Sequence, residues 1–382
     1  MPAFSLDPAQ TAWCAELRSL AADRLRPLAE KAERGEPGRV NRPLVAELGQ
    51  LGLLERLFTS GALDLCLMRE SLAYACTEAE TALALQGLGA HPVHAYGTPA
   101  QRERWLPRVS EGSAVAAFAL SEPGAGSDAA ALSLTARPDG PGRWRLTGEK
   151  CWISNAPEAD FCTVFARTTP GAGARGVTAF LVPADRPGLT GRALDMLSPH
   201  PIGALDFDAV PVTVDDVLGE ADRGFRVAMG TLNLFRPSVG AFAVGMAQAA
   251  LDATLAHTAR RDAFGGKLKD LQTVAHQVAE MALRTEAARL MVYAAATAYD
   301  ENAADVPKRA AMAKLLATET AQYVVDQAVQ LHGARALRRG HLLEHLYREV
   351  RAPRIYEGAS EVQRGIIAKE LYADAETLEA PQ

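Results

Sequence analysis

The segment His341-Leu342-Leu343-Glu344-His345 is a short pattern whose residue types and spacing could carry chemistry. It has the HxxEH order of inverted zinc peptidases, and residues i and i+4 share one face of a helix. A catalytic zinc needs a third protein ligand, and no acidic helix downstream stands out as its source. The surrounding arginines would oppose a dication; they are Arg338, Arg339, Arg348 and Arg351. A solvated or interface histidine pair is the favoured interpretation, and a zinc peptidase is kept as an alternative.

A glycine-rich segment, Gly124-Ala125-Gly126-Ser127-Asp128-Ala129, fits the GxGxxA pattern of dinucleotide-binding folds. That pattern needs a helix directly after the glycines within a βαβ unit. Another strand-like stretch follows here almost at once, so the context argues against a Rossmann fold.

Glu357, in Tyr356-Glu357-Gly358, is a candidate acid or base. Glutamate is common in the first turn of a helix, where it interacts favourably with the helix dipole. On local sequence alone, a role at the start of the following helix is the favoured interpretation.

Four longer segments carry more information when they are taken together. They are Phe118-Ala119-Leu120-Ser121-Glu122-Pro123-Gly124-Ala125-Gly126-Ser127-Asp128; Thr147-Gly148-Glu149-Lys150-Cys151-Trp152-Ile153-Ser154-Asn155; Arg260-Arg261-Asp262-Ala263-Phe264-Gly265 with Leu271-Gln272; and Gln330-Leu331-His332-Gly333 with Arg354-Ile355-Tyr356-Glu357-Gly358-Ala359-Ser360-Glu361-Val362-Gln363-Arg364. In this order and at these separations, the set resembles the acyl-CoA dehydrogenase family of flavoproteins, over nearly the whole chain.

The resemblance implies an FAD enzyme that removes an α-proton and a β-hydride from an acyl thioester, leaving a trans-2-enoyl thioester. Flavin N5 would accept the hydride, and an electron-transferring flavoprotein would then take the electrons. This chemistry requires a hydride acceptor stacked on an unactivated β-carbon and a carboxylate base in a dry site.

By this resemblance Glu357 is the catalytic base, which reverses the local interpretation. Some family members carry the base on another helix, but the comparable stretch, residues 234–240, has no carboxylate. The Glu357 N–H and a flavin ribityl hydroxyl would hold the thioester oxygen.

The resemblance also implies a set of flavin contacts. Trp152 would cover the flavin ring, and the Ser154 hydroxyl would reach N5. The other predicted cofactor residues are Phe118, Leu120, Ser121, Gly126, Ser127, Arg261, Phe264, Gln272, Gln330, Gly333, Ala334, Ala359 and Glu361. Those from Arg261 to Gly333 resemble residues that reach the FAD of a neighbouring subunit, which implies a homo-oligomer, in this family usually a tetramer. Arg261 as a plain surface charge and Trp152 as core packing are the alternatives.

Substrate contacts are implied at fewer positions. Asn233 and Arg236 fall where the family contacts pantetheine and the thioester end, while Ser127, Tyr356 and Gly358 would line the acyl site. Four features depart from the family pattern: Ala334 replaces a usual glycine, Ala359 replaces a usual threonine, Phe235 occupies a position that is often small or polar, and the loop of residues 55–61 is shortened.

The composition is that of an ordinary globular chain. It has 382 residues, 48% hydrophobic and 23% charged, with a formal net charge of -6. The acidic balance argues against nucleic-acid and membrane-surface binding. Five cysteines with no CxxC pair, and a first segment without a basic start and apolar core, lead us to expect a cytoplasmic protein. No apolar run approaches about 20 residues, so no membrane span is expected.

The elements that must position these residues follow an α, β, α order. Residues 1–111 are predicted to form an N-terminal helical domain. Residues 112–218 alternate in strand fashion at Leu132/Leu134, Trp144/Leu146 and Phe161/Thr163/Phe165, which predicts an antiparallel barrel or sandwich. Residues 219–382 are predicted to form a four-helix-bundle domain. Its apolar stripes are predicted at Val239 to Leu255; at Leu271, Val274, Val278 and Met281; and at Met312, Leu316 and Tyr323.

The leading hypothesis is therefore an FAD-dependent acyl-CoA dehydrogenase. Within the same class, the substrate could be an acyl chain on a carrier protein in a biosynthetic pathway. A flavin oxidase or monooxygenase on the same fold is a third possibility, and a non-catalytic helical scaffold is the alternative from another class.

Overall fold

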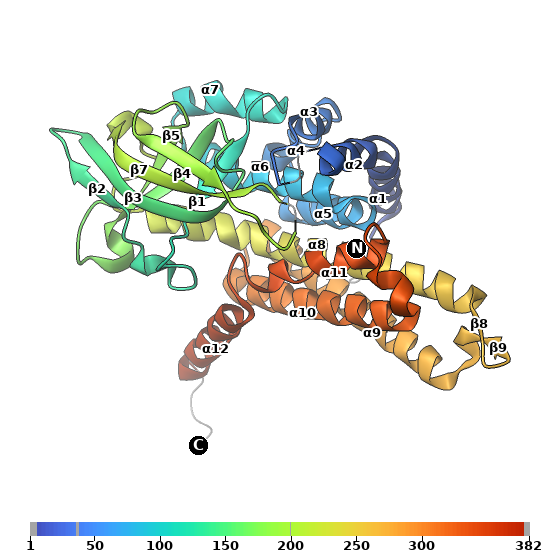
Figure 1. Cartoon of the computed structure of the whole chain (residues 1–382). Coiled ribbons are helices and arrows are strands. Elements are labelled where there is room, and N and C mark those ends of the chain that lie inside the picture. Colours follow the sequence, from blue (N-terminus) through green and yellow to red (C-terminus); the bar gives the residue numbers. More distant parts are fainter. Residues whose placement is uncertain (1–5, 36–37, 199, 378–382) are drawn as a thin grey trace, which may run out of the picture. The chain divides into compact units, whose positions relative to one another are not determined.

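The computed structural model describes residues 6–35, 38–198 and 200–377, and it confirms the predicted order of helices, strands and helices (Figure 1). The first helices are α1 (Pro8–Leu20), α2 (Arg26–Gly35), α3 (Arg42–Gln50), α4 (Arg56–Thr59), α5 (Ala62–Ala75), α6 (Thr77–Tyr96) and α7 (Pro99–Ser110). The strands are β1 (Ala116–Ala119), β2 (Thr135–Pro138), β3 (Arg143–Ser154), β4 (Phe161–Arg167), β5 (Val177–Pro183), β6 (Leu189–Ala193) and β7 (Ile202–Thr213). They are followed by α8 (Gly224–Arg260), the hairpin β8 (Asp262–Ala263) and β9 (Gly266–Lys267), α9 (Gln272–Asp300), α10 (Val306–His332), α11 (Leu342–Glu349) and α12 (Ser360–Thr377).

Contacts along the chain define two compact units, and each is described by itself. The helical unit comprises the described parts of Met1–Asp23, Gly61–Glu80 and Asn233–Gln382. The sheet unit comprises those of Arg24–Ser60 and Thr81–Leu232.

The sheet unit contains a curled sheet in the order β1-β4-β2-β3-β7-β6, with β5 also paired to β4 (Figure 1). Most pairs are antiparallel, as predicted, but β1 pairs with β4 in parallel, and β2 meets β4 in parallel at Thr135 and Arg167. The chain passes through β2 and β3 before it returns beside β1, so β4 can run in the same direction as β1.

Strand β4 is buried on both of its faces. Cys162, Val164 and Ala166 belong to one apolar cluster of the sheet unit, whereas Phe161 and Phe165 belong to another that includes residues of α6 and α7. The predicted strand residues in β3 and β4 are confirmed. Leu132 and Leu134 were expected in a strand; instead they precede β2 and insert into the two apolar clusters.

In the helical unit, α10 packs against α9 and α12, and α5 packs against α1 and α9. The α8 stripe is confirmed over most of its length, but Leu255 is 46% exposed. The predicted α10 stripe is wrong, because Met312, Leu316 and Tyr323 are only half-buried. The buried face of α10 is built mostly from alanines, including Ala313, Ala317 and Ala321. Small side chains let neighbouring helices approach closely, and a search for large apolar residues overlooks such a face.

Two other features differ from simple sequence expectations. Pro92 lies inside α6 and does not end a helix. Helix α8 contains an 18-residue window of mean hydropathy 1.4, long and apolar enough to cross a membrane, but 72% of that window is buried within the structure. The core helix of a soluble protein meets the same test.

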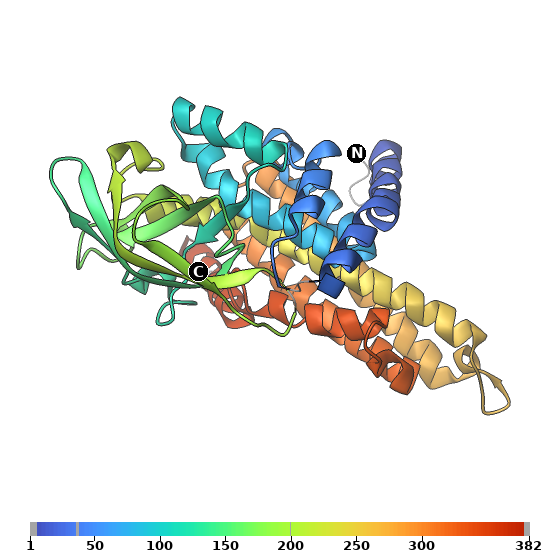
Figure 2. The same cartoon turned by 45° about the horizontal axis from the view of Figure 1, so that its top comes forward.

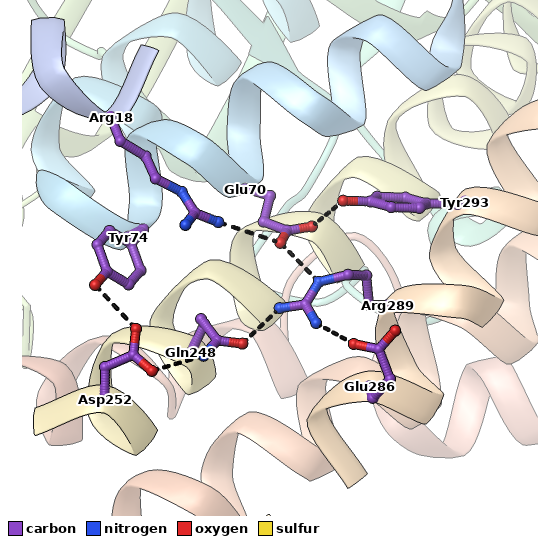
Figure 3. Close-up of polar contacts among 8 residues, drawn as sticks. All are labelled: Arg18, Glu70, Tyr74, Gln248, Asp252, Glu286, Arg289 and Tyr293. Atoms are coloured by element: carbon purple, nitrogen blue, oxygen red, sulfur yellow. Dashed lines mark hydrogen bonds and ion pairs between the residues drawn. The ribbon is translucent and has the colours of Figure 1, made fainter. Parts of the chain in front are cut away.

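A polar network joins α1, α5, α8 and α9 around Glu70 (Figure 3). The Glu70 carboxylate accepts hydrogen bonds from Arg289 Nε at 2.9 Å and from the Tyr293 hydroxyl at 2.8 Å. Arg289 also donates to Gln248 on α8, at 2.7 Å. Since Glu70 is 3% exposed, these contacts fix α5 against the long helices by satisfying a buried charge. Arg69, the preceding residue, belongs to the candidate site.

Candidate active site

Glu357 lies in the turn between the short 3₁₀ helix η7 (Ala352–Arg354) and α12, within the helical unit. Its backbone is left-handed, with φ +52°, and Gly358 follows with φ +97°. Such values are uncommon for a residue with a side chain. The Glu357 Oε2 atom is buried and has no hydrogen-bond partner within the described residues. The carboxylate therefore does not cap α12, and the interpretation from local sequence is wrong.

Three side chains hydrogen-bond to the carbonyls of this turn. Lys314 Nζ, on α10, donates to Gly358 O at 2.7 Å. Gln363 Nε2, on α12, donates to Gly358 O at 2.9 Å and to Glu357 O at 3.2 Å. Arg236 Nε, on α8, donates to Glu357 O at 3.3 Å. Three helices thus meet at one turn.

Glu319 on α10 holds the turn from both sides. Its carboxylate accepts a hydrogen bond from Ser360 Oγ at 2.6 Å and pairs with Arg354 Nη2 at 2.9 Å. Burial alone would raise the pKa of Glu319, but these two partners hold that pKa below its ordinary value. Because Arg354 precedes the turn and Ser360 follows it, both of its ends are tied to α10.

A buried ion pair lies near the Glu357 carboxylate. Arg69 on α5 pairs through Nε with Glu80 at the start of α6, and its Nη1 donates to Ser238 Oγ on α8 at 2.7 Å. Arg69 and Glu80 are 2% and 0% exposed. Arg69 is close enough to Glu357 and Tyr356 for their charges to influence one another.

The electrostatics of Glu357 combine burial with three neighbouring cations. Burial raises the pKa of Glu357, and the charges of Arg69, Lys314 and Arg236 oppose that rise. Burial lowers the pKa of Lys314 to about 8, opposed chiefly by the Glu357 charge. A raised pKa makes a carboxylate a stronger base, while nearby cations keep it ionised.

The structure brings several predicted substrate residues to this turn. Arg236 Nη1 donates to Asn233 Oδ1 at 3.3 Å, and Tyr356 and Gly358 flank Glu357 directly. Tyr356 exposes 37% of its surface. Ala359 is half-buried beside them, whereas Glu361 faces solvent near Arg364. Ser127 belongs to the sheet unit.

In the sheet unit, the predicted flavin residues fall on two neighbouring segments. Phe118 is on β1; Leu120, Ser121, Gly126 and Ser127 follow it; and Trp152 and Ser154 end β3. The two segments are joined by a hydrogen bond from Cys151 N to Ser121 O at 3.0 Å. Trp152 is 48% exposed and left-handed, with φ +57°.

A buried ion pair fixes the loop after β1. Glu122 accepts from Lys150 Nζ at 2.9 Å, from Ser133 N at 2.6 Å and from Leu134 N at 2.9 Å. Lys150 Nζ also donates to Leu120 O at 2.9 Å. Burial lowers the pKa of Lys150 to about 8, although Glu122 opposes that shift. Loop and strand are thus held together below the exposed indole.

The remaining predicted cofactor residues lie on the surface of the helical unit. The β8–β9 hairpin lies at the end of the α8–α9 pair (Figure 2). Phe264 stands between β8 and β9, left-handed with φ +52° and 90% exposed. Arg261, Gln272, Gln330, Gly333 and Ala334 are exposed as well.

The HxxEH histidines make structural contacts. His341 Nδ1 accepts from Leu343 N at 3.1 Å and so caps α11. His345 Nε2 lies 2.6 Å from Thr77 Oγ1. Within the described residues, no group of three or more His, Cys, Asp or Glu side chains could hold a metal ion.

Comparison with known proteins agrees with this arrangement. Profiles of the acyl-CoA dehydrogenase N-terminal, middle and C-terminal domains match residues 7–113, 117–210 and 222–372. The short-chain specific acyl-CoA dehydrogenase of Bos taurus mitochondria is 37% identical over 365 residues, covering 93% of this chain and 88% of the relative. This chain belongs to the acyl-CoA dehydrogenase family.

Solved structures are similar over nearly the whole chain. Butyryl-CoA dehydrogenase from Megasphaera elsdenii has a TM-score of 0.90 at 31% identity, covering 97% of this chain and 99% of that one. The FAD complex of PigA has a TM-score of 0.91 at 27% identity, covering 97% and 99%. The chain is thus an oxidoreductase of this family, as predicted.

The sheet unit of this family member fits a flavin. An exposed indole offers a flat apolar face, and a Cβ built at Gly124 or Gly126 would meet nothing within 4 Å. Backbone amides of an open glycine-rich loop suit a pyrophosphate. The buried Glu122–Lys150 pair keeps its own charges away from that surface.

Sequence reasoning missed four buried polar residues near Glu357. Arg69, Glu80, Lys314 and Gln363 are 2%, 0%, 0% and 0% exposed. The available signal was a charge inside an apolar stretch, as in Leu67-Met68-Arg69 and Met312-Ala313-Lys314-Leu315. Charged residues are almost never buried unless they are paired, so such positions merit attention.

Proposed function

We propose that this enzyme dehydrogenates a short acyl-CoA thioester to the trans-2-enoyl thioester, with Glu357 as the base. The observation that carries this proposal is a buried carboxylate with an unpartnered Oε2 atom, surrounded by Arg69, Lys314 and Arg236. A carboxylate that accepts no hydrogen bond from the described residues is free to take a proton, and burial raises its pKa, which makes it a stronger base.

The Glu357 backbone has a second role in this proposal. Its N–H donates no hydrogen bond within the described part of the chain. It is therefore available to the thioester oxygen, on which negative charge grows as the α C–H bond breaks and the proton moves to the carboxylate. Arg236, which donates to the Glu357 carbonyl, and Asn233 would orient the thioester end of the substrate.

FAD is the cofactor we propose, held by Trp152, Ser154 and the loop of residues 120–127. When bound, FAD accepts the β-hydride. Trp152 would cover one face of the ring and exclude water, and an electron-transferring flavoprotein is the proposed acceptor of the electrons. A short acyl group is favoured because two of the compared proteins are named for short-chain acyl-CoA and butyryl-CoA.

We further propose a homo-oligomer, in which exposed residues of the helical unit reach the cofactor of a second copy. Phe264, an aromatic ring 90% exposed, supports this, because such a side chain is costly to leave in water. Light scattering of the purified protein should give a mass above that of one chain, and Phe264→Ser should lower it. A monomeric wild-type protein would refute this part.

The function is tested by the visible spectrum of the purified protein under anaerobic conditions, before and after adding acetyl-, butyryl-, octanoyl- and palmitoyl-CoA. We expect a flavin spectrum that butyryl-CoA bleaches. Glu357→Gln should keep its flavin and lose the bleaching rate by about 10²- to 10⁴-fold. A flavin spectrum that no CoA ester bleaches would refute the proposed substrate class and direct the search to carrier-bound acyl groups or oxygen chemistry.

A further inference from the structure

Glu357 and Gly358 form a consecutive left-handed pair, with φ +52° and φ +97°. L-residues avoid this region, so the turn needs outside contacts to persist. A Cβ added at Gly358 would lie 2.3 Å from Gln363 Nε2, which shows how closely that amide approaches the backbone. The direction of the Glu357 side chain depends on this backbone geometry.

Besides Arg236, two side chains hold the carbonyls of this turn, and both of them are fully enclosed. Lys314 donates to Gly358 O at 2.7 Å, and Gln363 donates to both Gly358 O and Glu357 O. Both side chains are 0% exposed. The Lys314 ammonium on α10 and the Gln363 amide on α12 thus bind the two carbonyls of the turn together.

Neither side chain is well placed as a simple stabiliser. Gln363 leaves its own Oε1 buried without a partner in the part of the chain that the structure describes. Lys314 donates one hydrogen bond to the described residues and forms no ion pair with them within 4.0 Å. Burying a polar group whose hydrogen bonds are incomplete is unfavourable for folding. Lys314 and Gln363 therefore contribute by holding the carbonyls of the Glu357–Gly358 turn.

We propose that Lys314 and Gln363 are positioning residues for proton abstraction, which fix the two carbonyls of the turn so that the Glu357 carboxylate points at the substrate α-carbon. This inference rests on the proposed function. Neither residue transfers a proton itself, and a misplaced base slows the reaction steeply because proton transfer requires close, aligned atoms.

The proposal is tested by α-proton exchange with acetyl-CoA in D₂O, using the flavin-containing enzyme. Acetyl-CoA has α-hydrogens and no β-carbon, so only the base step can occur: Glu357 takes a proton from the α-carbon, exchanges it with solvent, and returns a deuteron. Mass spectrometry follows the label. Lys314→Met and Gln363→Met are each expected to slow exchange by about 100-fold at unchanged flavin content.

The pH profile separates positioning from a general loss of structure. Besides Glu357, the charged groups facing Lys314 are Arg236, Glu319 and Glu361. Lys314→Met removes a cation near Glu357, so the acid limb of the profile should move to higher pH. Gln363→Met removes no charge, so it should lower the maximum exchange rate of the pH profile and leave the pH of the acid limb unchanged. A merely structural role would move neither quantity when rates are expressed per bound flavin.

Thr318→Val is the matched control. Thr318 is buried on α10, one turn after Lys314, and its hydroxyl donates to Lys314 O within the helix. This variant should exchange at the wild-type rate. If Glu357→Gln abolishes exchange while Lys314→Met and Gln363→Met both exchange normally, the positioning proposal is overturned and the function stands. If Glu357→Gln still exchanges, or the wild-type enzyme acts on neither acetyl-CoA nor butyryl-CoA, the proposed function itself fails.

Discussion

Replacing Arg69 with methionine would separate what the buried ion pair does for stability from what it does for Glu357. Methionine fills the volume of the arginine stem but removes the charge and its donors. Glu80, 0% exposed, would lose its guanidinium partner. Removing one member of a buried pair costs about 3–5 kcal/mol, because the other charge is left uncompensated. We expect a loss of this size in chemical unfolding of Arg69→Met at neutral pH.

The double variant Arg69→Met/Glu80→Gln removes both charges. Replacing a buried ion pair with neutral side chains of similar volume is often neutral for stability, because no charge then has to be desolvated. Most of the lost free energy of unfolding should therefore return.

The effect on the base should persist in both variants. Burial raises the pKa of Glu357, and Arg69 is the first of three cations that oppose the rise. Without Arg69 that pKa moves further up, so a larger fraction of the base is protonated at a given pH and cannot accept a proton. The acid limb of the flavin-reduction rate should shift to higher pH in the single and the double variant alike.

Stopped-flow reduction by butyryl-CoA across the pH range is the assay. A double variant that regains stability but keeps the shifted limb would support the reasoning. An acid limb that coincides with that of the wild-type enzyme would refute it, because Arg69 would then have no electrostatic influence on Glu357. If Arg69→Met were as stable as the wild-type enzyme, the Arg69–Glu80 ion pair would not be desolvated in the folded protein.

Further outcomes follow from other buried charges. The pKa of Glu357 is raised on folding, so its carboxylate destabilises the fold increasingly as the pH rises above 4.5. Glu357→Gln should therefore have a higher melting temperature than wild type at neutral pH. A difference in melting temperature that stays the same down to pH 4.5 would contradict this. Lys150→Met, which leaves Glu122 without its cation, should lose about 3 kcal/mol in urea unfolding and retain less flavin, unlike a surface lysine variant. Arg289→Met should cost about 3 kcal/mol by the same assay because Glu70 stays buried, and a loss below about 1 kcal/mol would mean that Tyr293 alone satisfies it.

The overall architecture could be read from the sequence because its signals are local. Parts of β3 and β4 show a period of two in their sequence, and α8 shows its apolar stripe. The parallel pairing of β1 with β4 joins residues far apart in the chain, such as Phe118 and Thr163. No local pattern encodes such a partner, and so the sheet was expected to be antiparallel throughout.

The candidate site was predictable only in part, for a similar reason. Glu357 and Arg236 stand in motifs, and the structure places Arg236 Nε 3.3 Å from the Glu357 carbonyl. Lys314 stands in none of the four segments, and Gln363 stands in the fourth segment but was assigned no role. Lysine and glutamine on a helix normally face solvent, and only the packing of α10 and α12 shows that both side chains are enclosed.

The conformation of Glu357 argues against a purely structural role for this residue. A left-handed backbone at a residue with a side chain costs about 1–3 kcal/mol, and its buried Oε2 atom gains no hydrogen bond in return. A glycine would adopt the same φ more easily, and a glutamine would carry no charge. The start of α12 is held by other contacts, since Ser360 and Arg354 are tied to Glu319. The cost at Glu357 is understandable if an ionised, unpartnered carboxylate is needed there, and α-proton abstraction is a reaction that needs one.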